Sequence, residues 1–326
     1  MVIDMNLSEK VLKELAYANE PQSGEALAEK LNVSRNAVWK AVEALRQQGY
    51  EIDAATNKGY VLSENNTKLC GYLIERKLKF SSDVIFSDET DSTNAVIKRL
   101  AEDGAKEGTV AVSLSQTAGR GRLGRSFYSP PSGIYLSLLL RPKFSLQQSL
   151  MLTVAAAVAV CNAIEKNSGF ECQIKWVNDV YINGKKVCGI LTEGAIEAET
   201  GSLKYAVVGI GINLTAPKGG FPKDIADRAD TVFKTDEIRA EIAASVSADA
   251  LNGFFEYYRE IDKKQFMCEY RKRSYLDGKT VTFEQDGKAV TALVLGIDEN
   301  GGLIVKNGEK TEILTAGDVT IGASYA

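Results

Sequence analysis

Residues 116–131 read QTAGRGRLGRSFYSPP, and this glycine- and arginine-rich stretch determines how the rest of the chain is interpreted. The β-branched and apolar residues before it, 109–115, and after it, 134–140, predict two strands, so the stretch is a long loop between strands. Glycine lets a backbone approach a ligand closely, and arginine binds phosphate or carboxylate oxygens at two points. We therefore predict a loop that closes over an anion; a solvated basic turn is the alternative.

Gly119, Gly121 and Gly124 in this loop match the spacing of a dinucleotide-binding fingerprint. That fingerprint must open a helix, so that a pyrophosphate can lie on the helix N-terminus. Here Pro130 and Pro131 follow and prevent a helix from continuing directly after the loop. We therefore reject a dinucleotide-binding fold.

Composition defines the class of protein and excludes several chemistries. At 326 residues, with 25% charged and 44% hydrophobic side chains, the chain can form two or three ordinary globular domains. The net charge of -4 means that any nucleic-acid contact has to be a local basic patch. The sequence has no histidine, which excludes Ser-His-Asp catalysis, histidine zinc sites and histidine general bases.

The cysteines and the apolar segments indicate a cytoplasmic setting. The five cysteines are odd in number and form no CxxC pair, and the N-terminus carries charged residues instead of a signal peptide. The most apolar segment, 151–164, is shorter than a membrane-spanning helix. We expect it to be a buried helix and expect no membrane partner.

Residues 1–65 predict a separate winged helix-turn-helix unit. Apolar spacing predicts helices over 8–17, 23–31 and 34–45, and a serine caps each of the last two. A turn between two such helices is the helix-turn-helix layout, in which the second helix enters the major groove of DNA. Two further segments, 49–52 and 58–62, predict the strands of a wing joined by a turn at 54–57.

Charge gives this DNA-binding hypothesis only partial support. Acidic residues outnumber basic ones over the unit, but Arg35, Lys40 and Arg46 meet only Glu43 in the segment 32–48, so the reading helix is locally basic. Docking to another protein is the alternative role. The residues at the start of this helix that we expect to contact DNA are Ser34, Arg35, Asn36, Trp39 and Lys40.

A short polar linker, 64–67, leads into a second domain that we expect to span residues 66–274. The segment 69–78 predicts a helix, and a strand over 83–86 leads into a second helix that runs through Ala101. Ser92, Thr93 and Asn94 fall at the junction of that strand and helix, where hydroxyls and free N–H groups can hold a small polar ligand. Simple helix capping by Ser92 or Thr93 is the alternative.

The segment 172–185 predicts a strand, a tight bend and a second strand, ending in a hairpin turn at Asn183-Gly184. Lys175 lies here among apolar neighbours, and a lysine on a buried strand needs an anionic partner, from the protein or from a ligand. Asp179 is a candidate for that partner, or for a Mg²⁺ ligand beside a nucleotide. Both interpretations remain open at this point.

The remaining segments complete an α+β prediction. Gly209 and Gly211 alternate on a strand over 205–214, which leaves one face bare for a ligand or another backbone. Long helices are expected over 146–164 and 238–261, a shorter one over 265–273, and a loop over 218–230. Short strands separated by glycine turns predict a small β-barrel over 275–326, at 280–283, 289–297, 302–305 and 311–314.

Four motifs in this order resemble a known family along nearly the whole chain. They are GRGRLGR at 119–125, KWVND at 175–179, GIL at 189–191 and GIGIN at 209–213, all behind a helix-turn-helix. Together they resemble the bifunctional biotin–protein ligases that are also biotin operon repressors. The resemblance implies a central mixed sheet like that of class II aminoacyl-tRNA synthetases and a C-terminal SH3-like barrel.

The resemblance also implies an activity and its partners. Biotin and ATP, with Mg²⁺, would give biotinyl-5′-adenylate and pyrophosphate. The biotin would then pass to a lysine of the biotin carboxyl carrier domains of acetyl-CoA carboxylase and pyruvate carboxylase-type enzymes. When acceptor is scarce, the adenylate-bound homodimer would bind the biotin operator.

The roles implied for single residues follow the matching motifs. Asp179 stays the candidate Mg²⁺ ligand. Two positions depart from the family pattern, which often has proline at Val177 and tryptophan at Phe127. Those implied to hold the biotin ring system are Ser92, Thr93, Asn94 and Gln116. Those implied to bind the biotin carboxylate and the attacked phosphate are Arg120, Gly121, Arg122 and Lys175, with Arg120, Arg122 and Lys175 catalytic. Those implied to bind the adenylate are Arg120, Arg122, Arg125, Phe127 and Asn213.

The residue chemistry agrees with such a ligase. A carboxylate that attacks an α-phosphorus brings two anions together, so the site has to supply positive charge, and it needs no histidine base. Two alternatives remain: a ligand-sensing transcription regulator without catalysis, and a ligase that does not bind DNA. Biotin-dependent release of pyrophosphate from ATP would distinguish a ligase from a regulator without catalysis. A gel shift with biotin and ATP present would distinguish a DNA-binding ligase from one that does not bind DNA.

Overall fold

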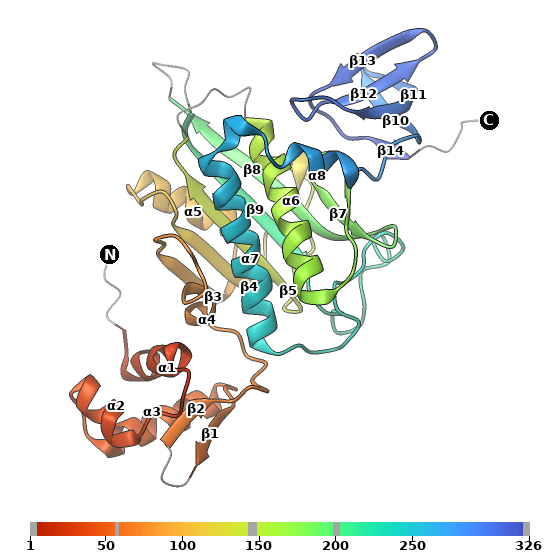
Figure 1. Ribbon diagram of the computed structural model, residues 1–326. Helices are drawn as coiled ribbons and strands as arrows, with labels where there is room; N and C mark the ends of the chain where they lie inside the picture. The colour runs from red at the N-terminus through yellow and green to blue at the C-terminus, as the bar shows by residue number, and fades with distance from the viewer. Residues whose placement is uncertain (1–4, 56–58, 143–148, 198–202, 322–326) are drawn as a thin grey trace.

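The computed structural model describes residues 5–55, 59–142, 149–197 and 203–321, which form three units in chain order (Figure 1). The N-terminal unit lies at one end of the central domain and the C-terminal sheet at the other. Residues 56 and 57 of the predicted wing turn at 54–57, and the first residues of the helix predicted from residue 146, lie outside the described residues.

The N-terminal unit is a winged helix-turn-helix, as predicted. Ser23 and Ser34 each accept a hydrogen bond from the backbone N–H three residues on, at 3.0 and 3.2 Å, so both serines cap their helices. Asn32 has the left-handed conformation that ends the second helix. The elements are α1 Leu7–Tyr17, α2 Gly24–Leu31, α3 Arg35–Gln47, and the antiparallel wing strands β1 Ile52–Ala55 and β2 Gly59–Leu62.

The first wing strand is as long as the predicted segment 49–52 but lies three residues later in the chain. It begins at Ile52, because Gly49 has a φ of +96° and turns the chain out of the helix into the wing. Tyr60 of the second strand exchanges two backbone hydrogen bonds with Gln22, at 2.7 and 2.8 Å. The wing is thereby tied to the segment that precedes α2.

Gly59 makes that attachment possible, and Gly59→Ala is expected to loosen the wing. Its φ is +98°, and a Cβ there would lie 2.2 Å from the Gln22 carbonyl oxygen. Gly104→Ala is the matched control, since Gly104 has a φ of +86° with no atom within 4 Å of the added carbon. We expect the control to lose about 1 kcal/mol from φ strain alone and Gly59→Ala to lose more, measured by thermal unfolding. Equal losses would show that the contact with Gln22 is unimportant.

The linker at 64–67 is ordered and packed. Asn66 is buried, accepts a hydrogen bond from Glu51 N at 3.1 Å, and donates one to Lys68 O at 2.8 Å. Arg76 donates to Ala16 O at 2.5 Å and to Glu241 at 2.7 Å, which joins the N-terminal unit to the central domain. The helix predicted over 69–78 shrinks to α4, Gly71–Glu75.

The central domain is built on a seven-stranded mixed sheet in the order β3-β4-β5-β9-β8-β7-β6. Only the β3–β4 pair is parallel; the other neighbours are antiparallel. The strands are β3 Val84–Thr90, β4 Val110–Gln116, β5 Gly133–Leu140, β6 Gln173–Lys175, β7 Asp179–Ile182, β8 Lys185–Ile196 and β9 Leu203–Asn213. A mixed sheet of this topology agrees with the predicted fold class.

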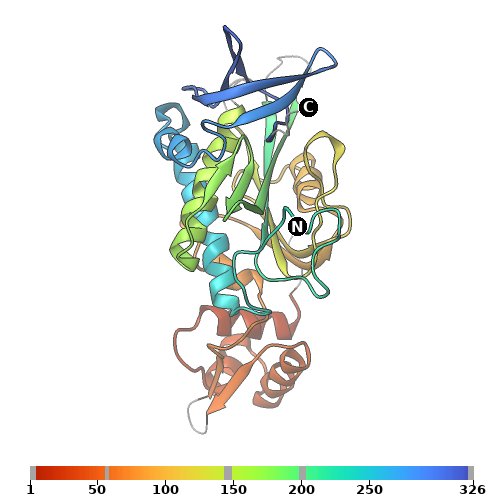
Figure 2. The same cartoon turned by 90° about the vertical axis from the view of Figure 1, so that its right-hand side faces the viewer.

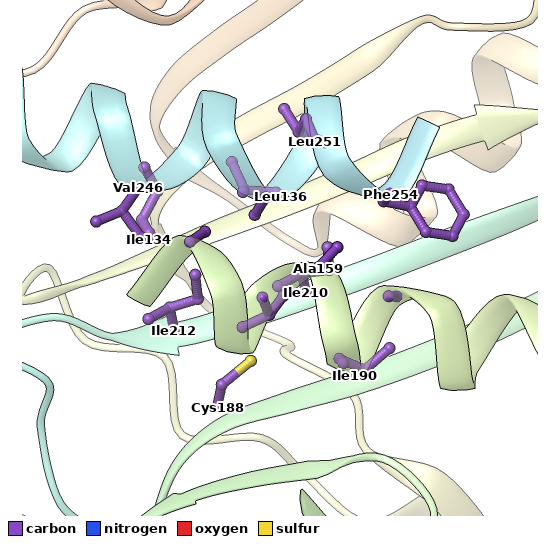
Figure 3. Close-up of a cluster of buried hydrophobic side chains, with 14 of the residues drawn as sticks. Ile134, Leu136, Ala159, Cys188, Ile190, Ile210, Ile212, Val246, Leu251 and Phe254 are labelled. Atoms are coloured by element: carbon purple, nitrogen blue, oxygen red, sulfur yellow. The ribbon is translucent and has the colours of Figure 1, made fainter. Parts of the chain in front are cut away.

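Helices cover both faces of this sheet (Figure 2). On one face lie α6, Ser149–Ser168, and α7, Ala240–Arg259, while α5, Thr93–Glu102, lies on the other. Because side chains alternate along a strand, each central strand contributes to both layers. Figure 3 shows the α6–α7 layer, whose labelled members are Ile134, Leu136, Ala159, Cys188, Ile190, Ile210, Ile212, Val246, Leu251 and Phe254.

The helix α6, Ser149–Ser168, extends beyond both ends of the apolar segment 151–164 from which it was predicted. It has 20 residues and by length and hydropathy alone could cross a membrane. The prediction that this segment is too short to span a membrane is therefore wrong. Its burial supports the expected role, because most of its length is buried in the layer that it forms with α7 on the sheet. It is the only such helix among the described residues.

The C-terminal unit is a five-stranded antiparallel sheet in the order β13-β12-β11-β10-β14. It docks onto the central domain through backbone acceptors: Trp176 Nε1 donates to Gly301 O at 2.8 Å and Arg271 Nε to Ile297 O at 3.0 Å. The helix predicted over 265–273 is α8, Met267–Lys272. The strands are β10 Thr280–Gln285, β11 Lys288–Ile297, β12 Leu303–Asn307, β13 Lys310–Leu314 and β14 Thr320–Ile321.

Candidate active site and DNA interface

The sheet face under α5 becomes bare beyond the end of that helix. Along β9, Val207 packs against α5, whereas the next two residues on this face are Gly209 and Gly211. A Cβ at Gly209 would lie 2.1 Å from Asn94 Oδ1, and one at Gly211 would lie 2.6 Å from the Phe127 ring. The alternating glycines therefore make room for two side chains, where the sequence predicted a ligand or a backbone.

The glycine–arginine loop folds back on itself as a flap beside these glycines. Phe127 N donates to Gly119 O at 2.9 Å, and Gly121 N donates to Arg125 O at 2.7 Å. Its tip, Arg122–Gly124, makes one 3₁₀ turn and then becomes extended. No α-helix follows the glycines, which confirms that the dinucleotide fingerprint does not apply.

One cavity of about 810 Å³ lies between the flap, the N-terminus of α5 and the strands β6–β9. It brings together every residue that the sequence assigned to biotin, ATP or Mg²⁺. These residues are Ser92, Thr93, Asn94, Gln116, Arg120, Gly121, Arg122, Arg125, Phe127, Lys175, Asp179 and Asn213. They come from four stretches of the chain, 92–94, 116–127, 175–179 and residue 213, so their convergence is a property of the fold.

The Ser92–Asn94 junction is not explained by serine or threonine capping. Ser92 occupies the N-cap position of α5, but its hydroxyl makes no capping hydrogen bond. The cap comes from the neighbouring strand, because Gln116 Oε1 accepts a hydrogen bond from Thr93 N at 2.9 Å and lies 3.2 Å from Thr93 Oγ1. Gln116 Nε2 in turn donates to Ser129 Oγ at 3.0 Å, so the strand end, the helix and the flap form one unit.

Two of the three flap arginines are held by the C-terminal unit. Arg122 donates to Asn178 Oδ1 at 3.2 Å and to Gly317 O at 3.0 Å. The Asp318 carboxylate lies 2.6 Å from Arg125 and 3.5 Å from Arg122. Arg120 is exposed and has no ion pair within the part of the chain that the structure describes. The contribution of the C-terminal unit was not predicted from sequence.

Asp318→Asn is expected to lower the KM for ATP about twofold to fivefold, a modest effect because Arg125 is well exposed and the ion pair is screened. The Asp318 carboxylate neutralises the two guanidinium groups that are assigned to phosphate. Steady-state kinetics at low and high salt would measure the change, which should shrink as salt rises. Glu312→Gln, which removes the Lys310 ion pair of the same unit, is the control. An increased KM would show that Asp318 instead holds the arginines in a binding position.

Lys175 has no ion pair among the described residues, although it is half-buried in the cavity wall. Asp179 is its register partner across the β6–β7 bend, but its carboxylate lies 2.7 Å from Lys186 Nζ. The structure therefore does not support the Lys175–Asp179 ion pair considered from sequence. Burial lowers the pKa of Lys175, while Asp179 acts in the opposite direction.

The predicted bend between β6 and β7 is present despite Val177, and the Trp176–Val177 peptide is cis. The Phe127 ring meets the Tyr135 ring edge-on, with the two ring centroids 6.3 Å apart. Lys186 Nζ lies 5.6 Å from the centroid of the Phe127 ring. Asn213 is buried, and its Nδ2 donates to Asp230 O at 3.0 Å. Its side-chain oxygen remains the group for the expected adenine contact.

The predicted DNA-contacting residues lie on the exposed side of the start of α3. The buried side of this helix is formed by Val38, Ala41, Val42 and Leu45. Arg46 differs from the expectation of a basic patch, because its guanidinium binds Glu43 at 2.7 Å and the Ile52 carbonyl of the wing. The exposed residues are Ser34, Arg35, Asn36, Trp39 and Lys40, with Trp39 51% exposed.

Sequence reasoning missed several polar residues that line or support the site. Lys186 and Asp318 are ion-pair partners that only the fold brings close. Ser137 and Glu193 bind the Ser92–Asn94 junction from β5 and β8. A signal for Ser137 existed, since it is the one small hydroxyl residue in the otherwise apolar strand 133–140.

Comparison with known proteins agrees with this geometry. Residues 86–213 match the model of the biotin/lipoate A/B protein ligase family, residues 8–61 an HTH domain, and residues 278–322 the biotin protein ligase C-terminal domain. The bifunctional ligase/repressor BirA of Bacillus subtilis (strain 168) is 36% identical, over 93% of this chain and 95% of its own. The biotin--[acetyl-CoA-carboxylase] ligase of Mycobacterium tuberculosis is 31% identical over 71% of this chain and 86% of its own.

A solved structure shares the fold. The biotin protein ligase of Aquifex aeolicus in complex with biotin and ATP has a TM-score of 0.60 and 30% identity, covering 73% of this chain and 97% of that one. The chain therefore belongs to the biotin–protein ligases. Within that family, it resembles the bifunctional ligase/repressors from the N-terminal helix-turn-helix to the C-terminal sheet.

Proposed function

We propose that this protein joins biotin to ATP as biotinyl-5′-adenylate, transfers the biotin to a lysine of a carrier domain, and represses transcription through its N-terminal unit. The observation that carries the ligase activity is Lys175. It is a half-buried ammonium without a carboxylate partner among the described residues, and it lines the same cavity as three flap arginines. A buried cation needs an anion, and here a ligand supplies it.

The positions of the side chains support different binding roles for the residues in different parts of the cavity. Ser92, Thr93 and Gln116 at the α5 end bind the polar ring system of biotin. Arg120, Arg122 and Lys175 bind the biotin carboxylate and the α-phosphate, where their positive charge stabilises the pentavalent transition state. No proton has to leave biotin, whose carboxylate is ionised at neutral pH.

Phe127, Arg125 and Asn213 bind the adenylate from the flap and from β9. The flap covers the acyl-adenylate and excludes the water that would hydrolyse it. Phe127 already packs on Gly211, so the adenine would meet a ring that the sheet supports. A phenylalanine gives a smaller stacking surface than tryptophan, which is compatible with binding but reduces the contact area.

Asp179 is the carboxylate that fits a Mg²⁺ ion brought by ATP. Its Oδ1 is buried and, although 2.7 Å from Lys186 Nζ, lacks hydrogen-bond geometry to any described residue. No cluster of three or more metal-binding side chains occurs among those residues, which suits an ion held mainly by phosphates. The metal would neutralise phosphate charge.

The finer partners follow from the same proposal. The acceptors are biotin carboxyl carrier domains of acetyl-CoA carboxylase and pyruvate carboxylase-type enzymes. The exposed start of α3, with Arg35 and Lys40, supports binding of the biotin operator by the adenylate-bound homodimer.

Pyrophosphate release from ATP tests the ligase activity directly. We expect release that requires biotin, followed by labelling of a carrier domain. A regulator that only senses a ligand would bind biotin without consuming ATP, and that result would overturn the proposal. Sensing alone does not require three arginines and a lysine that pairs with no described carboxylate around one cavity.

A further inference from the structure

Glu193, on β8, connects α5 to the sheet beside the biotin end of the cavity. Its carboxylate accepts a hydrogen bond from Lys98 Nζ at 2.5 Å and another from Asn94 Nδ2 at 2.7 Å. Asn94 Nδ2 also lies 3.3 Å from the Leu191 carbonyl oxygen. A carboxylate and a carbonyl only accept, so both fix the Asn94 amide with its nitrogen toward β8.

The opposite end of the Asn94 amide therefore faces Ser137. Ser137 Oγ lies 2.6 Å from Asn94 Oδ1 and 2.7 Å from Thr93 Oγ1. A hydroxyl has one proton, and Asn94 Oδ1 can only accept, so Ser137 satisfies this buried oxygen by donating to it. The proton of the second contact then comes from Thr93.

The Thr93 hydroxyl is left with its lone pairs available to the cavity. The alternative acceptor for the Thr93 proton, Gln116 Oε1, is more distant at 3.2 Å. It already accepts a hydrogen bond from Thr93 N at 2.9 Å. With its proton committed to Ser137, Thr93 can accept a hydrogen bond from a ligand but cannot donate one. Through Asn94 and Ser137, Glu193 thus determines that the Thr93 hydroxyl accepts hydrogen bonds from the cavity.

We propose that Glu193 is a positioning residue that, through Asn94 and Ser137, holds the Thr93 hydroxyl as an acceptor and so selects a ring that presents an N–H group. The inference rests on the proposed function, because biotin's ureido ring has such N–H groups. It adds the specificity element: a buried acceptor rejects an analogue that offers an oxygen at the same place.

Two features keep the chain of contacts in one arrangement. Asn94 is 5% exposed and fills the space that Gly209 leaves, so its amide cannot move away from Glu193 and Ser137. Burial alone would raise the pKa of Glu193, but Lys98, Asn94 and the Arg120 charge hold it below its usual value. The carboxyl group is therefore ionised at neutral pH and acts only as an acceptor.

Without Glu193, the Asn94 amide is no longer held in one orientation. The Asn94 amide can then turn its nitrogen toward Ser137, and the Thr93 proton becomes free to point into the cavity. An analogue with an acceptor in place of the N–H then gains a donor that the wild-type chain withholds. Selectivity falls while the groups that act on the carboxylate and phosphate stay in place.

The experiment compares biotin with its cyclic carbamate analogue, in which one ureido N–H is replaced by oxygen. Biotin- or analogue-dependent pyrophosphate release is measured for the full chain and for Glu193→Ala. We expect Glu193→Ala to raise the KM for biotin about tenfold or more, with kcat within about twofold. The preference for biotin over the analogue, as the ratio of kcat/KM values, should fall about tenfold or more.

Three further variants separate positioning from general stability. Glu193→Gln with Lys98→Met keeps a neutral acceptor for Asn94 and should restore most of the preference. Ser137→Ala breaks the chain at one buried atom without a change of backbone, and should lower the preference even if Glu193→Ala folds poorly. Glu102→Gln removes another carboxylate–lysine pair between α5 and the sheet, that with Lys204 at 2.5 Å, and should change nothing.

An unchanged preference in Glu193→Ala and Ser137→Ala would overturn the inference, as would an equal effect of Glu102→Gln. The wild-type chain distinguishes this failure from failure of the proposed function. If the wild-type chain releases pyrophosphate with biotin, the ligase activity stands whatever the variants do. If it does not, the proposed function itself is wrong.

Discussion

Lys175→Ala is expected to reduce biotin-dependent pyrophosphate release by about two to three orders of magnitude, the usual effect of removing one group that stabilises developing charge. Lys175 is the cavity's half-buried ammonium and has no ion pair among the described residues. Removing one partner of a buried pair normally leaves an uncompensated charge and destabilises the fold. Here no protein charge is left behind, so the melting temperature should stay close to that of the wild-type chain.

Lys185→Ala is a matched control for this variant. Lys185 begins β8, in the β7–β8 hairpin that follows the Lys175 strand β6, but it does not line the active-site cavity. It should therefore retain pyrophosphate release at the wild-type level. Normal adenylate formation by Lys175→Ala would remove Lys175 from the mechanism, and a large loss in both variants would point to a general effect on the hairpin.

The pH dependence gives a second measure of the same group. Burial lowers the pKa of Lys175, so as pH rises the free protein loses this ammonium earlier than an ordinary lysine would. A bound carboxylate and phosphate favour the charged form and move the pKa back up. The alkaline fall of kcat/KM, which reports the free protein, should therefore occur at lower pH than the fall of kcat. Coincident alkaline limbs would argue against Lys175 as the titrating group.

The sequence predicted those parts of the protein that depend on local pattern. Serine caps before helical spacing located α2 and α3, and Asn183-Gly184 located the β7–β8 turn, where both residues have positive φ. Elements without a strong cap or stop were misjudged at their ends. The segment 69–78 has apolar spacing, but only Gly71–Glu75 is helical.

The site was predicted as a set of residues, but the partners of each were not. Gly209 and Gly211 showed that something approaches the sheet, yet which groups do so depends on where α5 and the flap end in space. Pairing of Asp179 with Lys175 was plausible from spacing, because a two-strand bend puts them opposite each other. Lys186 arrives from a third strand and takes the carboxylate. Such competition among long-range neighbours is absent from any local pattern.

Replacing Arg35 and Lys40 together by alanine is expected to weaken operator binding by about one to two orders of magnitude at moderate salt. Both side chains are exposed on the side of α3 that faces away from its apolar neighbours. The salt slope of the binding constant should fall by about one unit for each DNA phosphate that the variant no longer neutralises. Biotinylation of a carrier domain should continue at the wild-type rate, because neither residue lines the active-site cavity.

This double variant is a sharper test than deletion of residues 1–65. Deletion should abolish operator binding and spare part of the ligase chemistry, but it also removes Ala16 O, an acceptor of Arg76, and uncovers the surface around Asn66. Lys288→Ala with Lys306→Ala is the matched control, since it removes two exposed positive charges from the C-terminal unit. If both double variants weaken operator binding equally, net charge and not α3 determines affinity. If neither does, the helix-turn-helix docks to another protein.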